Sequence, residues 1–227
     1  MGPARILLSW SGGKDAAWAL HTLREVAAAG GIVGLMSAVV PAFDRISMHG
    51  VRTPLVRAQA RAADLPLLEV PLPWPCSNER YEAEFLAALA VARRRWSVTH
   101  VAFGDLFLQD VRAYRERLLA GAGVTPLFPL WGLPTDTLLH TMLDGGLRAR
   151  IVCLDPARLD RSFAGRDLAS AAAELPAGVD PCGERGEFHT FVTDGPMLSD
   201  SVSVELGEVV EREGFVYADL LPAAAHV

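Results

Sequence analysis

The chain has 227 residues, of which 51% are hydrophobic and 21% charged, a composition that can bury a core and excludes a disordered chain. Its net charge of −6 disfavours extensive nucleic-acid binding, because such proteins usually carry a basic surface that neutralises phosphates. The sequence shows no apolar run of about eighteen residues, no signal-peptide pattern and only three cysteines, so we expect a reduced cytoplasmic protein without a membrane span.

The first part of the chain alternates apolar strands with amphipathic helices. We expect strands at 5–10, 32–40, 65–72, 99–103 and 124–130, and helices at 15–29, 52–63, 78–96, 111–120 and 135–143. This alternation is typical of a parallel sheet covered by helices on both faces. The expected fold class is therefore α/β, a Rossmann-like five-stranded parallel sheet that binds ligands at the carboxyl ends of its strands.

After about residue 147 the regular alternation of strands and helices ends. We expect a strand at 149–154, a short helix at 167–174, a strand at 187–193 and a terminal hairpin formed by 201–206 and 215–220. We therefore divide the chain into a nucleotide-binding region, 1–146, and a smaller α+β region, 147–227, packed over the carboxyl edge of the sheet. The open edge of the hairpin is compatible with a homodimer.

The loop 11–15, with sequence SGGKD, follows the first strand and precedes the first helix. Its glycines let backbone N–H groups approach phosphate oxygens, and the helix N-terminus adds partial positive charge. Lys14 is the single lysine among 21 basic residues, which indicates a specific need for an ammonium group. Asp15 offers hard oxygens to Mg²⁺. The loop is not a Walker A motif, because Leu8 and Asp15 stand where that motif needs Gly and Ser or Thr.

This loop resembles the pyrophosphate-binding loop of the N-type ATP pyrophosphatases, which cleave ATP to AMP and pyrophosphate. The whole chain resembles the diphthine–ammonia ligase family. The matching segments are SGGKDAAWAL (11–20), SMHG (47–50), GDLFLQDVRAYRERL (104–118), LFPLWGLPTDTLL (127–139) and PCGERGEFHTFVTDGPML (181–198). The resemblance implies a ligase that adenylates a carboxylate with MgATP and lets ammonia displace AMP. In eukaryotes and archaea the substrate is diphthine, a modified histidine of translation elongation factor 2.

The resemblance also implies the site residues. The ATP site is expected to comprise Ser11, Gly12, Gly13, Lys14, Asp15, Ala16, Ser37, His49, Gly104 and Asp105. Asp15 and Asp105 are expected to hold Mg²⁺, and catalysis is expected from Lys14, Asp15, Glu184, Glu187 and His189. Alternation along a strand would place Glu187 and His189 on one side. Simpler interpretations stay open: a packed histidine at 49, a helix N-cap at 105 and a solvated turn at 184–189.

Two departures from the family pattern leave the acceptor undecided. Ala16 stands where Ser is common, and Arg185 and His189 replace residues of the motif found in proven diphthamide enzymes. One alternative is therefore an ATP-binding or nucleotide-hydrolysing protein of the same fold with a different acceptor. A second is a tRNA-modifying enzyme, which the acidic charge and the absence of a cysteine partner near Cys182 disfavour.

Overall fold

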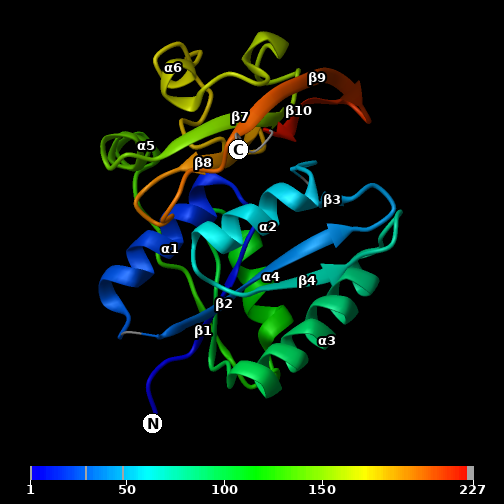
Figure 1. Cartoon of the computed structure of the whole chain (residues 1–227), viewed down its shortest axis with the longest axis vertical. Helices are drawn as coiled ribbons and strands as arrows, with labels where there is room; N and C mark the ends of the chain where they lie inside the picture. The colour runs from blue at the N-terminus through cyan, green and yellow to red at the C-terminus, as the bar shows by residue number, and fades with distance from the viewer. Residues whose placement is uncertain (1, 29, 48, 224–227) are drawn as a thin grey trace.

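The computed structural model describes residues 2–28, 30–47 and 49–223 (Figure 1). Ala29, the expected end of the first helix, and Met48 of the SMHG segment lie outside these ranges. Within them, no helix combines the length and the apolar character needed to cross a membrane.

A mostly parallel sheet forms one half of the molecule (Figure 1). Its five parallel strands pair in the spatial order β4 (Leu67–Pro71), β2 (Ile32–Val40), β1 (Ile6–Ser9), β5 (His100–Ala102) and β6 (Thr125–Leu127). This confirms the expected α/β class. A sixth strand, β3 (Arg45–Ile46), pairs antiparallel with the end of β2 and was not expected, because two residues carry no readable periodicity.

Helices cover both faces of this sheet. One buried cluster packs against α1, α2 and α5, and a second packs against α3 and α4. Leu7 and Leu8, neighbours on β1, belong to different clusters, as alternation along a strand requires. The bounds of the helices are Lys14–Val26 for α1, Thr53–Ala62 for α2, Asn78–Trp96 for α3, Gln109–Leu119 for α4 and Thr135–Asp144 for α5.

The rest of the chain forms a four-stranded antiparallel sheet in the order β8, β7, β10, β9. Its elements are β7 (Arg148–Leu154), a 3-10 turn η1 (Arg161–Phe163), α6 (Leu168–Ala172), β8 (Phe188–Asp194), β9 (Val204–Arg212) and β10 (Phe215–Pro222). The terminal hairpin is present, but β9 starts and ends later than expected. Gly207 stays inside the strand, and the chain reverses at Glu213 and Gly214, both with positive φ.

The two sheets share one buried core, since a single apolar cluster draws residues from β1, α1, β7 and β8. The N–H of Val192 on β8 donates to the carbonyl of Gly12 at 2.9 Å. The antiparallel sheet therefore lies directly on the loop that follows β1, and residues from both halves of the chain meet there (Figure 1).

Candidate functional site

The glycine-rich loop lies between the end of β1 and the start of α1. Gly12 adopts φ +78, a conformation that side chains rarely take, and a Cβ there would lie 2.7 Å from Gln59 Oε1. A Cβ on Gly13 would lie 2.9 Å from His49 Cε1, and the Gly13 N–H donates to Ser11 Oγ at 3.2 Å. Both positions therefore favour glycine, because neighbouring residues of the protein occupy the space where a Cβ would stand.

Gln59 on α2 holds this loop in place and was missed from the sequence. Its side chain is fully buried; Nε2 donates to the carbonyls of Gly12 at 3.0 Å and Val192 at 2.6 Å. Its Oε1 accepts from Trp10 Nε1 at 3.0 Å. The sequence held one signal for this role: Gln59 lies on the same face of α2 as the buried Leu55. A buried amide side chain needs hydrogen-bond partners, so a polar contact was to be expected at this position.

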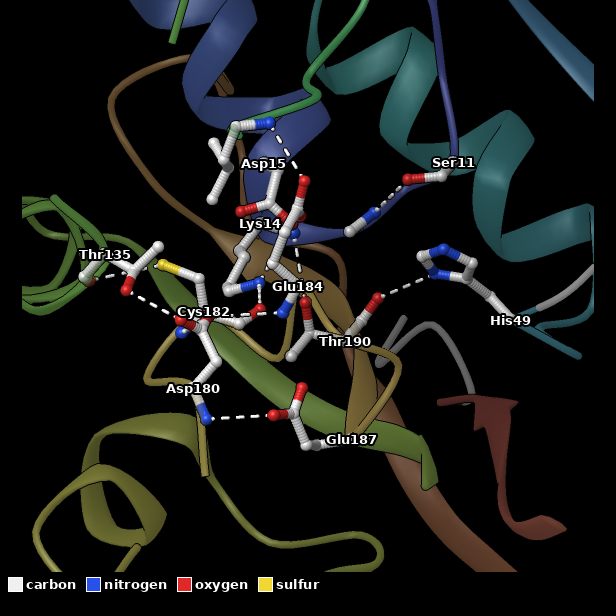
Figure 2. Close-up of polar contacts among 12 residues, drawn as sticks. Ser11, Lys14, Asp15, His49, Thr135, Asp180, Cys182, Glu184, Glu187 and Thr190 are labelled. Carbon is white, nitrogen blue, oxygen red and sulfur yellow. Dashed lines mark hydrogen bonds and ion pairs between the residues drawn. The ribbon is translucent and has the colours of Figure 1, made fainter. Parts of the chain in front are cut away.

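Lys14 is buried, with 2% of its surface exposed, and Figure 2 shows its side chain beside Asp15 and Cys182. Its ammonium forms an ion pair with Asp15 at 2.9 Å and donates to the carbonyl of Cys182, and its N–H donates to Thr190 Oγ1 at 3.0 Å. Burial lowers the pKa of Lys14, but the charges around it, Asp15 first, outweigh this and leave the pKa raised. The side chain therefore stays a cation inside the protein.

Asp15 Oδ1 and Asp105 Oδ2 are buried carboxylate oxygens that accept no hydrogen bond within the described part of the chain. Asp105 Oδ2 does form an ion pair with Arg115 Nε, at 3.5 Å. Burial is the main cause that raises the pKa of both carboxyls. A Cβ on Gly104 would lie 2.8 Å from the carbonyl carbon of Asp15, so the two loops are in contact.

These two oxygens fit Mg²⁺ in the way it binds with nucleotides, through one or two carboxylates together with phosphate oxygens. Over the described part of the chain, no group of three or more His, Cys, Asp or Glu side chains is arranged to hold a metal by itself. The donor set thus suits a metal that arrives with a phosphate ligand.

Glu184 reaches the same place from the loop before β8. Its Oε1 accepts from the N–H of Leu106 at 2.9 Å (Figure 2). Burial, with the neighbouring charges of Asp15 and Asp105, raises the pKa of Glu184 to about 7 despite that hydrogen bond. The structure therefore brings Glu184 close to Lys14, Asp15 and Asp105.

Glu187 occupies a different environment. It is 2% exposed, and its carboxylate accepts from the N–H groups of Asp180 at 3.0 Å and Arg185 at 3.0 Å. Figure 2 shows it turned toward Asp180. These contacts close the loop that contains Glu184, so the structure gives Glu187 a place in the loop's framework, with none of its described hydrogen bonds made to the residues around Lys14.

His49 and His189 stack on each other with ring centroids 4.5 Å apart and an interplanar angle of 28°. His49 Nδ1 lies 3.2 Å from the carbonyl oxygen of Thr190. Burial lowers the pKa of His49 well below its usual value, and burial with the charge of Lys14 lowers that of His189 to about 4. Both rings are therefore neutral near pH 7. His189 contacts the ring of His49, whereas the Glu187 carboxylate accepts from backbone N–H groups of its own loop, so these two neighbouring residues contact different partners.

Three further positions were named from the sequence. Ser37 is 1% exposed and its hydroxyl donates to the carbonyl of Trp10 at 2.5 Å, so its proton is used inside the protein. Ala16 is buried in the first turn of α1. Cys182 is buried, its Sγ donates to the carbonyl of Thr135 at 3.4 Å, and burial raises its pKa to about 12. A protonated, buried thiol does not favour sulfur transfer.

The comparisons with known proteins point to one family. A family model described as the diphthamide synthase C-terminal domain matches residues 134–219, from the start of α5 into β10. Diphthine–ammonia ligase of Bos taurus is 23% identical over 94% of this chain and 88% of the bovine protein. The Homo sapiens enzyme of the same name is 25% identical over 73% of this chain and 63% of its own length. That of Schizosaccharomyces pombe is 29% identical over 49% of this chain but only 19% of its own length.

Proposed function

We propose that this chain is a member of the diphthine–ammonia ligase family and acts as an ATP-dependent amide ligase, as the family-model match over residues 134–219 and the relatives of that name support. It adenylates a carboxylate, releases pyrophosphate, and transfers the acyl group to ammonia with release of AMP. The observation that carries the proposal is the single lysine of the chain, held at the start of α1 in an ion pair with Asp15, whose other oxygen, Oδ1, is buried without a hydrogen-bond partner among the described residues.

ATP binding uses the loop 11–15. The backbone N–H groups of Gly13 and Lys14 lie at the N-terminus of α1, where the helix dipole favours phosphate oxygens. Ser11 and Thr190 accept hydrogen bonds from these two groups, and the carbonyl of Cys182 accepts from the Lys14 ammonium. A phosphate oxygen replaces these neutral partners with a charged one, which strengthens each hydrogen bond.

We propose that Asp15 and Asp105 hold Mg²⁺ together with the phosphates, since Asp15 Oδ1 is buried without a partner among the described residues and the buried Asp105 Oδ2 meets only Arg115, in an ion pair at 3.5 Å. Bound Mg²⁺ supplies neutralisation of the charge that develops on the leaving pyrophosphate. Gly104 keeps this arrangement compact, because its lack of a Cβ lets the Asp105 loop contact Asp15.

The chemistry then proceeds in two displacements. An oxygen of the acceptor carboxylate attacks the α-phosphorus, and the bond from that phosphorus to the bridging oxygen breaks toward pyrophosphate, whose charge Lys14 stabilises. Ammonia next attacks the acyl carbon, AMP leaves, and the attacking nitrogen loses a proton. Glu184 is the best-placed acceptor for that proton, because its carboxylate lies in the site and its pKa is about 7. His189, with a pKa of about 4, is a weak base.

For the acceptor we propose diphthine on elongation factor 2, in keeping with the name that the relatives carry. Arg185, one of the two departures from the diphthamide motif, is exposed beside Glu184 and is available to contact the acceptor. A cytoplasmic location follows from this choice of acceptor. A homodimer through β9, an edge strand with Leu206 half exposed, stays a further proposal to be tested by the oligomeric state in solution.

The test is AMP release from α-labelled ATP with Mg²⁺, with and without ammonium and diphthine-bearing elongation factor 2. AMP that depends on both additions and is lost in Lys14→Ala supports the ligase. Arg94→Ala, which removes an exposed cation from the end of α3, is the control. Slow hydrolysis that ignores the factor would instead favour the same fold acting on another acceptor. Co-purifying RNA and a salt-steep affinity would favour a tRNA-modifying enzyme.

A further inference from the structure

The loop 180–187, just before β8, is organised by the carboxylate of Asp180. This side chain is 8% exposed. Its Oδ1 accepts from the N–H groups of Cys182 at 3.0 Å and Glu184 at 3.2 Å. Its Oδ2 accepts from the hydroxyl of Thr135, the first residue of α5, at 2.8 Å. One carboxylate therefore ties the turn 182–184 to a helix of the other half of the chain (Figure 2).

The turn that Asp180 holds presents two groups to the site. The carbonyl of Cys182 accepts from the Lys14 ammonium, and the Glu184 carboxylate accepts from the N–H of Leu106, next to Asp105. Glu187 supports the same turn from its other end through the N–H groups of Asp180 and Arg185. The polar groups that meet Lys14 from this loop thus depend on the hydrogen bonds of Asp180.

We propose that Asp180 is a positioning residue: by accepting from Cys182, Glu184 and Thr135 it sets the 182–184 turn against Lys14. Its consequence for turnover rests on the proposed function, whereas its effect on Lys14 does not. A carboxylate that only closed a surface turn would need neither its burial nor the bond to α5, so these two features carry the assignment.

The chain offers a direct probe, because Lys14 is its single lysine. Acylation of amines in the native, nucleotide-free protein, followed by peptide mapping, measures the exposure of Lys14 separately from the N-terminal amine. In Asp180→Ala the turn loses its acceptor, and we expect the acylation rate of Lys14 to rise roughly tenfold. Asp180→Asn keeps an oxygen for the two N–H groups and is expected to stay within about threefold of the original rate.

Asp167→Ala is the matched control. Asp167 Oδ1 also accepts from two backbone N–H groups, those of Ala169 at 3.0 Å and Ser170 at 3.3 Å, at the start of α6. Its loss is expected to leave Lys14 acylation unchanged. Thr135→Val removes the anchor on α5 alone and is expected to raise acylation about threefold, which keeps a test available if Asp180→Ala fails to fold.

A second readout is turnover. Asp180→Ala is expected to lower kcat for AMP formation at least about tenfold with a smaller change in the KM of ATP, and Asp180→Asn to restore most of it. The proposal is overturned if Asp180→Ala or Thr135→Val keeps the fold and the original acylation rate, or if Asp167→Ala raises that rate equally. Absence of AMP formation in the unaltered protein counts against the proposed function alone, since the acylation result stands without it.

Discussion

The Lys14 ammonium donates to the carbonyl oxygen of Cys182, a residue 168 positions further along the chain. The same ammonium lies 5.5 Å from the centroid of the Phe188 ring and 2.9 Å from the Asp15 carboxylate. A slender stem carrying a compact charge fits this enclosed position, which gives a physical reason why the one lysine of an arginine-rich chain stands here.

Lys14→Arg is therefore expected to fail although it keeps the charge. The larger, forked guanidinium has no room between the Cys182 carbonyl and Phe188, and overpacking of this kind costs about 1–3 kcal/mol. We expect a lower Tm and pyrophosphate release reduced at least about tenfold. Thermal unfolding and a pyrophosphate assay check this, and unchanged turnover would show that the position needs only a positive charge.

Thr190→Val tests whether Thr190 competes with phosphate for the loop. Without the hydroxyl, the buried N–H of Lys14 loses its acceptor, which costs the nucleotide-free protein about 1–3 kcal/mol. ATP supplies a new acceptor, so we expect a lower Tm without ATP and a larger rise of Tm on adding it. Weaker ATP binding, measured by calorimetry, would mean instead that the hydroxyl stays in contact with the loop in the complex.

Gly104→Ala should disturb the start of α1. The added methyl would lie 2.8 Å from the carbonyl carbon of Asp15 and 2.9 Å from the N–H nitrogen of Ala16, and neither backbone atom can move without shifting the loop. We expect ATP affinity to fall at least about tenfold. Gly2→Ala, which meets nothing within 4 Å, is the control and should bind as before. Equal affinities would show that the loop adapts.

The stacked histidines predict a loss of stability in acid. The pKa of His189 is about 4 in the folded protein against 6.5 for an ordinary histidine, so between these values only the unfolded chain takes up the proton. Stability is full above about pH 6.5 and falls toward pH 4, by about 2 kcal/mol at pH 5 from this residue. In urea unfolding, His189→Gln should lose about that much less than the original protein between pH 7.5 and 5. Equal losses would contradict the assignment.

Glu184 and Glu187 are expected to respond in opposite ways to the same change. Glu184→Gln removes a carboxylate from the site and should lower kcat while leaving Tm close to its original value. Glu187→Gln replaces an acceptor of one buried and one partly buried N–H group and should lower the free energy of unfolding by about 1–3 kcal/mol. Parallel kinetics and denaturant unfolding distinguish them, and a reversed pattern would assign catalysis to Glu187.

The sequence by itself determined the α/β class, the order of the parallel strands along the chain and the loop 11–15 at the end of β1. These features follow from local properties: apolar periodicity, glycines and a lone lysine within a few residues of one another. The strand β3 was not predicted, because its two residues are too few to show a periodic pattern.

Only the tertiary structure decided which polar side chains organise the site. Gln59 bonds to Val192, 133 residues away, and the Lys14 N–H to Thr190, 176 residues away. It also gave Glu187, which the sequence had suggested as a catalytic residue, hydrogen bonds within the framework of its loop, and it placed Asp180, which the sequence did not single out, at the centre of that loop. A hydrogen bond between distant segments leaves no periodic trace in either one, so such partners become visible only when β8 packs on the phosphate loop.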